Sequence, residues 1–377
     1  MKRKRKIFRI LVVAALMLAT ALATFCYRYY REGYQSVTHT ERQAVETSAK
    51  SDAIKGALNQ EVRKASNAYL SVPEWFIVYI SDDYAFAIAQ TAPSAFAYRE
   101  YLADYWRLYG RLAALIENAY PPDSEYHAMV RVIGVSTTVE FGLKAVYENT
   151  VGHLFEWISG YATPEDSYAA GVARDYVTFI RLQPWYEFEF RKALVELWTT
   201  LPIGGNSVLR KFERRTILSV EYAVKWGYAS LIEWATHEAF GVADTDTYVR
   251  LSGDPEKIAK TDERIRILAS GTSADAEITA VIPRYQPFTE IAPKVAANGG
   301  VFRSIAGQKF LTVGILAPEG FRTTSGATLI ASTLVHIDPQ PDSRRHRLLY
   351  WVAAGKLGDF LSETAKAGGT LEHVYDF

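Results

Sequence analysis

Cysteine is almost absent from this sequence. Cys26 is the only cysteine among 377 residues, which excludes intrachain disulfides and cysteine-based metal sites. The chain also lacks net charge, because 42 Lys and Arg residues balance 42 Asp and Glu residues. A neutral chain gives no indication of binding to nucleic acid or to a strongly anionic partner, so we expect neither.

The common signatures of catalysis are missing as well. The sequence contains no Gly-rich phosphate loop, no nucleophile elbow and no metalloprotease helix. We therefore expect no cofactor, and no catalytic activity is evident.

Two histidines lie near carboxylates on predicted helices, His153 with Glu156 and His237 with Glu233. Carboxylate-bridged di-metal bundles use Glu-x-x-His on paired helices. Here the order is reversed in one pair and the spacing is wrong in the other. We expect these four residues to be polar groups near helix ends and not metal ligands.

Long apolar runs are scarce, and the clearest is at the N-terminus. Five basic residues at 2–6 precede an uncharged run at 10–25. Such a start fits a cleaved secretory signal, with ALA at 21–23 as the cleavage site. It also fits a retained membrane anchor, since 7–27 supplies the roughly 20 residues that a spanning helix needs.

Aromatic residues at the end of this run favour the anchor, because such residues gather at membrane interfaces. They are Phe25, Tyr27, Tyr29 and Tyr30. The basic start places the N-terminus in the cytoplasm. We therefore expect an inner-membrane protein of a bacterium, with the bulk of the chain in the periplasm.

The length exceeds the roughly 250–300 residues at which a single core stops growing, so several domains are expected. The predicted order is a basic cytoplasmic tip with a transmembrane anchor (1–30), a polar helical stalk (31–68), a helical domain (69–241) and an α+β domain (242–377). The predicted fold class is thus multi-domain α and α+β.

The helical domain carries one pattern twice. VEFGLKAVYE at 139–148 resembles VEYAVKWGYA at 220–229. Upstream, YREYLADYW at 98–106 parallels FRKALVELW at 190–198, and Tyr84-Ala85 matches Tyr168-Ala169. The offsets differ by the size of loop insertions. We predict a pseudo-duplicated domain with repeats at about 81–160 and 163–241. Each repeat is expected to start at a helix cap, Ser81 in the first and Thr163, followed by a proline, in the second.

Each repeat places a Glu, a Lys and a Tyr close together on one helical face. They are Glu140, Lys144 and Tyr147 in the first, and Glu221, Lys225 and Tyr228 in the second. Three interpretations remain open. The residues form exposed pairs within each helix, or the helices pack so that Glu140 meets Lys225 and Glu221 meets Lys144, or the groups handle protons or a substrate.

A basic cluster precedes the second pattern, with Arg210, Lys211, Arg214 and Arg215. Such clusters are usually solvated, and contact with anionic lipid headgroups is the alternative. If the predicted helices at 124–158 and 207–240 entered the bilayer, this cluster would flank a span, as in transporters with inverted repeats. The sequence leaves that point open.

The C-terminal part changes to β-branched runs separated by Gly, Pro and turn residues. Predicted strands lie at 264–270, 276–285, 299–318, 328–337, 347–354 and 370–377, with helices at 287–297 and 356–367. The order β-α-β-β-α-β predicts a ferredoxin-like module with additional strands. This fold hosts many roles, so it assigns no function by itself.

The leading functional hypothesis is a membrane-anchored scaffold or binding protein of the cell envelope, with a protein partner there. The alternative is a polytopic membrane transporter or membrane enzyme that uses the paired Glu and Lys residues of the repeats. The sequence does not indicate an oligomeric state.

Overall fold

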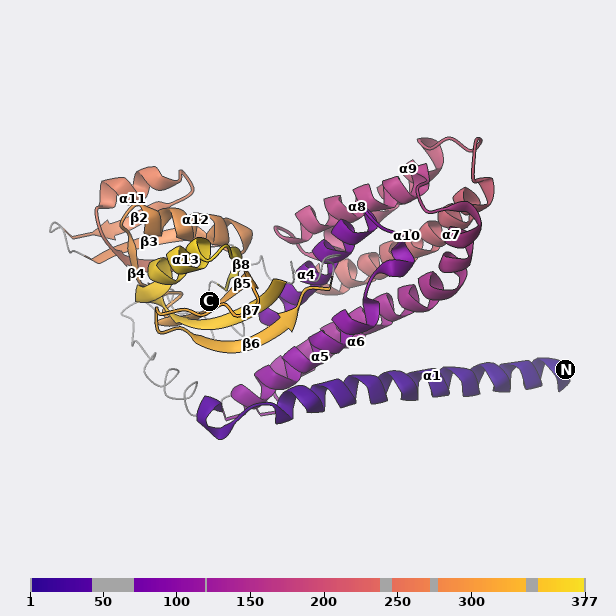
Figure 1. Cartoon of the computed structure of the whole chain (residues 1–377), viewed down its shortest axis with the longest axis horizontal. Coiled ribbons are helices and arrows are strands. Elements are labelled where there is room, and N and C mark those ends of the chain that lie inside the picture. Colours follow the sequence, from indigo (N-terminus) through magenta and orange to yellow (C-terminus); the bar gives the residue numbers. More distant parts are fainter. Residues whose placement is uncertain are drawn as a thin grey trace.

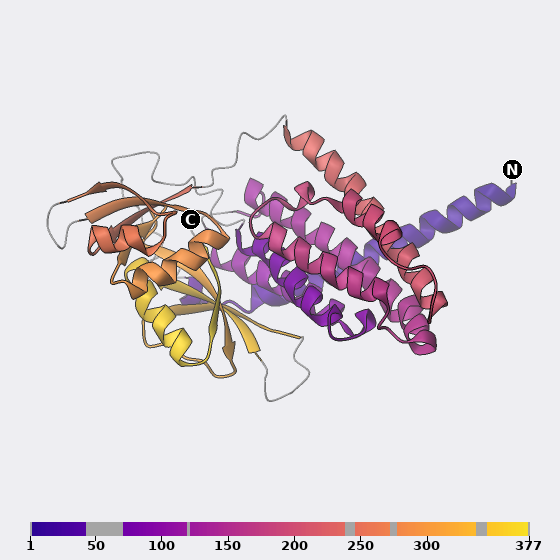
Figure 2. The same cartoon turned by 90° about the horizontal axis from the view of Figure 1, so that it is seen from above.

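Helices and two antiparallel sheets make up an elongated molecule (Figure 1). The computed structural model describes residues 2–42, 71–118, 121–237, 246–271, 277–336 and 345–375. A helical body (71–237) forms one end and an α+β domain (246–375) forms the other (Figures 1 and 2). This confirms the expected combination of α and α+β structure.

Helix α1 (Lys2–Gln35) crosses α5 (Tyr98–Leu115) at a pair of glycines. A Cβ atom on Gly33 would lie 1.9 Å from a carbonyl oxygen of α5, and one on Gly110 would lie 2.0 Å from a carbonyl oxygen of α1. The two backbones are in direct contact there, so only glycine fits at either position.

No helix, within the part of the chain that the structure describes, has a stretch apolar enough to be recognised as a membrane span. The side chains of residues 2–12 are not among those described, and the anchor at 1–30 stays a prediction. The predicted stalk (31–68) begins inside α1, and from residue 43 it lies outside the described residues.

The helical body repeats one order of elements: helix, 3-10 turn, helix, long helix. The first series is α4 (Ser71–Ile88), η1 (Pro93–Ala95), α5 and α6 (Glu125–Tyr147). The second is α8 (Pro164–Ile180), η3 (Trp185–Glu187), α9 (Phe190–Thr199) and α10 (Val208–His237). A π-helical turn, η2 (Glu148–Gly152), and α7 (His153–Ser159) connect the two series.

Corresponding side chains make the same contacts in both series. Trp106 donates its Nε1–H to the Thr138 hydroxyl at 2.9 Å, and Trp198 donates to the Ser219 hydroxyl at 2.8 Å. These bonds join the third element of each series to the fourth. They support the predicted duplication, which stays a prediction.

The sequence alignment of Tyr84 with Tyr168 is wrong. Tyr84 meets Phe96 edge-on at 5.2 Å, and Tyr176 meets Phe188 edge-on at the same distance. The offset of 92 residues that relates these pairs also relates η1 to η3. Tyr176 is therefore the counterpart of Tyr84. Tyr168-Ala169, about two helical turns before Tyr176, matched Tyr84-Ala85 by chance, because small apolar residues recur along α8.

Eight strands form the two sheets of the α+β domain. The first sheet contains β1 (Asp246–Ser252), β2 (Arg266–Ser270), β3 (Glu277–Pro283) and β4 (Val301–Ile305), with helices α11 (Pro255–Thr261) and α12 (Gln286–Ala297). The second contains β5 (Phe310–Pro318), β6 (Thr328–Leu334), β7 (Arg345–Ala353) and β8 (Thr370–Val374), with helix α13 (Leu357–Lys366).

Both sheets have the same topology. The strand orders are β2-β3-β1-β4 and β6-β7-β5-β8, and every neighbouring pair is antiparallel. The order β-α-β-β-α-β occurs over 246–305, although β1 and α11 were not predicted from the sequence. The predicted motif used the helices at 287–297 and 356–367, which belong to different sheets, so its placement was wrong. The ferredoxin-like assignment stays a prediction.

The α+β domain packs directly against the helical body. One hydrophobic core joins Phe76 and Ile80 of α4 to Ile330, Leu349 and Tyr375 of the second sheet. The α+β domain also has a core of its own, which includes residues of both sheets and of all three of its helices. Buried apolar side chains therefore connect the two parts of the chain.

Candidate functional site

Four charged side chains meet between α6 and α10. Lys144 Nζ lies 2.9 Å from Glu221 Oε1, and Lys225 Nζ lies 2.8 Å from Glu140 Oε1. The contacts within each helix are longer, at 3.8 Å for Lys144 with Glu140 and 3.1 Å for Lys225 with Glu221. These four residues, the charged ring, make both of the cross-helix pairs that the second interpretation of the sequence predicts.

Aromatic rings support the two lysines of the charged ring: Tyr84 and Phe141 beside Lys144, and Tyr176 and Phe190 beside Lys225. Each Nζ lies between 4.4 and 5.5 Å from the ring centroids. An ammonium group this close to an aromatic face gains roughly 0.5–2 kcal/mol, more as water is removed. The charged ring is therefore held in place by its surroundings on both sides of the helix contact.

The two tyrosines predicted beside the ring lie elsewhere. Tyr147 donates a hydrogen bond to Glu213. Tyr228 stacks on Trp185 with ring centroids 5.4 Å apart. Sharing a helical face was not enough to bring them to the ring, because each has a nearer partner on another element.

The space beside the charged ring is small. A cavity of about 40 Å³ touches all four ring residues and is also lined by Ile88, Val172 and Leu218. This volume holds a few water molecules. It is far below the roughly 300 Å³ at which pockets for small-molecule ligands begin.

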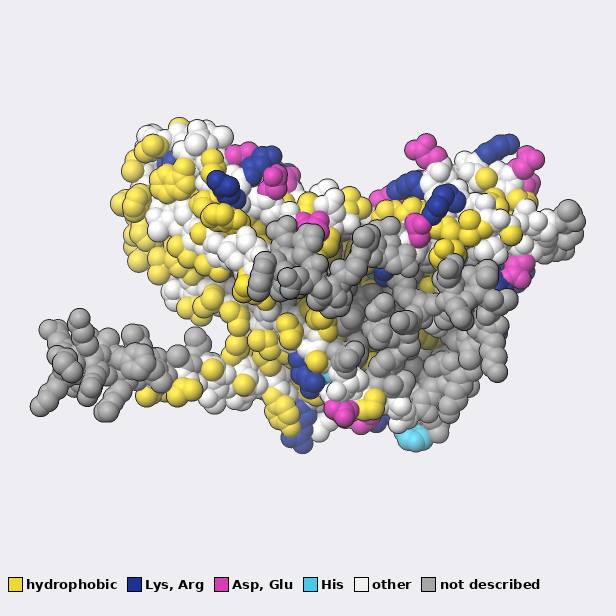
Figure 3. All heavy atoms as spheres, turned by 180° about the vertical axis from the view of Figure 1, so that it is seen from behind, with side chains coloured by type: hydrophobic (Ala, Val, Ile, Leu, Met, Phe, Trp, Pro, Cys, Tyr) yellow, Lys and Arg dark blue, Asp and Glu magenta, His cyan; other side chains and the backbone are white. Residues whose placement is uncertain are grey.

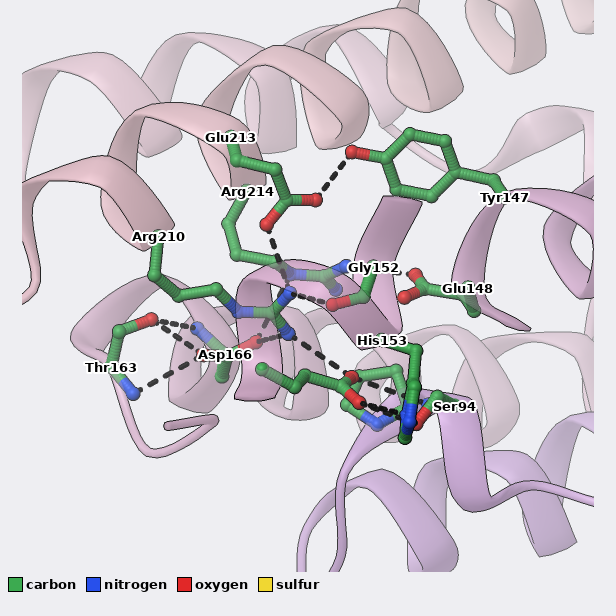
Figure 4. Close-up of polar contacts among 12 residues, drawn as sticks. Ser94, Tyr147, Glu148, Gly152, His153, Thr163, Asp166, Arg210, Glu213 and Arg214 are labelled. Atoms are coloured by element: carbon green, nitrogen blue, oxygen red, sulfur yellow. Dashed lines mark hydrogen bonds and ion pairs between the residues drawn. The ribbon is translucent and has the colours of Figure 1, made fainter. Parts of the chain in front are cut away.

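The basic cluster at the start of α10 is buried, so the prediction of a solvated face or headgroup-binding patch is wrong. Arg210 is 0% exposed, Arg214 1%, Arg215 3% and Lys211 7%. Carboxylates of the π-helical turn, α7, α8 and α10 contact the three arginines. Figure 4 shows Arg210 and Arg214 with their partners. We call these four basic residues and their partners the arginine cluster.

Arg210 lies at the centre of this cluster. Its guanidinium contacts Glu213 at 2.9 Å, Asp166 at 3.0 Å and Glu156 at 3.4 Å. It also donates a hydrogen bond to the Gly152 carbonyl at 3.3 Å. A buried arginine needs such partners, because removing a charge from water without them costs several kcal/mol.

The remaining basic groups have partners of their own. Arg214 pairs with Glu148 at 2.8 Å and with Asp166 at 3.0 Å. Arg215 pairs with Glu165 at 2.8 Å and donates to two carbonyls of the loop before α10. Lys211 donates to the carbonyl of Gly204 at 2.7 Å.

Local sequence places the carboxylates. Thr163 and Asp166 form the capping box that starts α8. Asp166 also accepts a hydrogen bond from Arg210 and forms an ion pair with Arg214. Glu148 opens the π-helical turn, and a Cβ atom on Gly152 would lie 2.4 Å from its Oε2. The capping signal was readable from the sequence. The widened turn and its glycine carried no recognisable signal.

The two residues of the predicted polar pair in α7, His153 and Glu156, lie in different environments. Glu156 is buried against Arg210 and accepts a hydrogen bond from Ser94, whereas His153 is largely exposed, with Nδ1 3.8 Å from Glu156 Oε2. Among the described residues, no group of three or more His, Cys, Asp or Glu has a metal-binding arrangement. The side chains of Glu233 and His237 lie outside the description.

A third charged group joins the helical body to the α+β domain, and sequence reasoning missed it. Arg347 of β7 binds Glu372 of β8 through two hydrogen bonds of 2.7 Å and contacts Asp83 of α4 at 3.3 Å. Tyr101 donates to Asp83 at 2.8 Å. Burial raises the pKa of Asp83 and of Glu372, and Arg347 opposes that shift.

Beside this group, His373 is buried between the two parts of the chain. Its ring stacks on Trp75 with centroids 3.6 Å apart, and its Nδ1 lies 3.0 Å from the Thr289 hydroxyl. Burial lowers the pKa of His373 well below its usual value, and Arg181 adds to the effect. The imidazole is therefore neutral in the folded protein.

The chain matches no known protein family, no curated protein and no solved structure. Function is therefore inferred from the geometry of these three charged groups and from the surfaces around them.

Proposed function

We propose that this chain is a membrane-anchored scaffold or binding protein of the bacterial cell envelope, without catalytic activity. In this proposal α1 carries the anchor, its basic start lies in the cytoplasm, and the α+β domain lies on the outer side of the inner membrane. The helical body is an old duplication. The α+β domain contains a ferredoxin-like module, with the β-α-β-β-α-β order of 246–305, and binds an envelope protein.

The observation that carries this proposal is the internal pairing of the charges. Each lysine of the charged ring contacts both of its glutamates, and each arginine of the arginine cluster has a carboxylate partner. The cavity of about 40 Å³ is too small for a typical small-molecule ligand. Charges that satisfy one another in this way set the register of packed helices, which is a structural task.

The test removes one charge of the ring while keeping its shape. Glu221→Gln leaves Lys144 and Lys225 each with one partner fewer, and Glu221 is only 21% exposed. A scaffold should lose about 1–3 kcal/mol of stability, after allowing for partial exposure. Its thermal midpoint in detergent should fall. The matched control is Glu256→Gln on α11, where the pair with Lys260 is exposed.

The same variants decide between the proposal and the polytopic transporter or membrane enzyme that uses the ring. The second candidate is favoured by one observation, that buried charges follow α10 from Arg210 to Lys225. In proteoliposomes with an imposed pH gradient, a transporter would move protons or ions, and both Glu140→Gln and Glu221→Gln would fold normally and stop the flux. Flux of this kind would overturn the scaffold proposal.

A further inference from the structure

Two segments of the helical body, 132–173 and 193–232, keep their charges inside, whereas exposed charges lie elsewhere on the body, as at Arg131, Arg174 and Asp175. Every Asp, Glu, Lys and Arg of residues 132–173 and 193–232 is buried or half-buried. These are the residue types that water-soluble domains place at the surface and almost never bury completely. In these two segments the charged side chains face the interior, which is the reverse of their usual placement in water-soluble domains.

The outer face of α6 is apolar from Val132 to the end of the helix, after the exposed Arg131. The exposed large side chains of this part are Val132, Val135, Val139, Leu143 and Val146. They recur every three or four residues, which places them on one side of the helix. The charged ring lies on the other side, towards α10.

Helix α10 shows the same division. Its exposed large side chains include Val208, Phe212, Val220, Val224 and Leu231, and the arginine cluster and the charged ring face inward. At 1.5 Å per residue this stripe is roughly 35 Å long. The hydrocarbon core of a bilayer is about 30 Å thick.

The end of the helical body farthest from the α+β domain continues this surface. Trp157 of α7 is 80% exposed, and Ile203, in the loop before α10, is 74% exposed. Figure 3 shows hydrophobic and uncharged side chains covering this end, with the charged ones mainly nearer the α+β domain. The N-terminal half of α1 projects in the same direction as this end, apart from the body (Figures 1 and 2), and it exposes Val13, Leu16 and Met17.

The mean hydropathy of a whole helix does not reveal this apolar surface. The mean over α10 includes the arginines, glutamates and lysines that face inward, whereas a surrounding medium meets only the outward side chains. Charged residues within a bilayer face the protein interior and pair with one another. The arginine cluster and the charged ring meet both conditions.

We infer that the acyl chains of a lipid bilayer cover this surface, so that α6, α7 and α10 are inserted in the membrane beside α1. The α+β domain stays in water. Three observations select lipid as the occupant: the outward side chains from Val132 to Val146 and along α10 are uncharged, the length of this face matches a bilayer, and α1, which exposes apolar side chains of its own, projects in the same direction. This inference rests on the proposed function, because the anchor places the helical body at the membrane.

The test measures what surrounds single positions on the full chain in phospholipid vesicles. In a Cys26→Ser background, spin labels are attached at Leu143→Cys and Val224→Cys, and at Lys257→Cys as the water-exposed control. Oxygen concentrates in acyl chains, and a nickel chelate stays in water. We expect the labels on α6 and α10 to collide more with oxygen than with nickel, and the control label to show the opposite order.

Two results would overturn the inference. Nickel accessibility at 143 and 224 equal to the control would show a water-exposed face. Inaccessibility to both reagents would show that a protein, either a second copy or a partner, covers it. A readout on the unsubstituted chain guards against misfolded variants, since lipids brominated in the acyl chain should quench part of its tryptophan fluorescence, and Trp157→Phe should reduce that part.

Vesicle flotation separates this inference from the proposed function. A chain that floats with the vesicles while its labels stay accessible to nickel is anchored by α1 alone, and only the inference fails. A chain that does not float lacks the anchor, and both proposals fail.

Discussion

Replacing Arg214 by methionine tests whether the arginine cluster holds the helical body together. Arg214 is 1% exposed at its side chain, and its partner Glu148 is 6% exposed, with 2.8 Å between them. Arg214→Met keeps much of the volume but leaves Glu148 buried without its cation. Removing one partner of a buried pair costs about 3–5 kcal/mol, and screening by water does not reduce this figure when both groups are inside.

That loss is a large part of the roughly 5–15 kcal/mol that stabilises a folded protein. At about 2–4 °C for each kcal/mol, the thermal midpoint should fall by about 10 °C. The assay is thermal unfolding of the full chain in one detergent, followed by circular dichroism. Arg266→Met is the matched control, because Arg266 lies 62% exposed beside Asp246 and such surface pairs contribute about 0–1 kcal/mol.

A double variant separates lost pairing from lost packing. Glu148→Gln in the Arg214→Met background removes the stranded carboxylate, so the double variant should be more stable than the sum of the two single losses implies. If Arg214→Met unfolds at the same temperature as Arg266→Met, the buried pair does not stabilise the helical body, and the reasoning is refuted.

Two further predictions concern the contacts around the helical body. Acidification should destabilise the folded protein through His373. In the unfolded chain its imidazole gains a proton below the usual pKa of 6.5, whereas in the folded protein burial lowers that pKa. The contribution of His373 to stability is therefore complete above pH 6.5 and falls as the pH drops towards the lowered pKa. The thermal midpoint should therefore decline between about pH 7.5 and about pH 5, and His373→Gln should remove that part of the decline. Gly110→Ala should push α1 away from α5 and expose Cys26, the only thiol, to faster maleimide labelling in detergent, whereas Gly227→Ala, which has open space around it, should not. An unchanged labelling rate for Gly110→Ala would contradict the close crossing.

Local pattern allowed much of the helical body to be predicted. The Thr163 cap is confirmed, and the internal repeat led to both cross-helix pairs of the charged ring. Such features depend on residues a few positions apart, or on two segments with the same pattern, and these are visible in a single sequence. The helix start predicted at Ser81 is wrong, because α4 already begins at Ser71. The counterpart of Tyr84 was misplaced because one short apolar match outweighed the spacing to the following turn.

The α+β domain was predicted in part. Both of its longer helices, α12 and α13, were expected, and strands were expected near most of those observed. The division into two sheets was not, since strand pairing is a long-range property. β5 reads as a continuation of the run that contains β4, yet it is an inner strand of a different sheet.

Taken alone, the sequence determined the start of some helices, such as α8, and which residues share a helical face, and its repeated pattern predicted both cross-helix pairs of the charged ring. Only the tertiary structure decided which charges are buried. Arg210 and Arg347 look like solvated residues because their partners, such as Asp166 and Asp83, are far away along the chain. Folding brings each carboxylate within hydrogen-bond distance of its arginine, and this ion pair offsets the free-energy cost of removing the guanidinium from water.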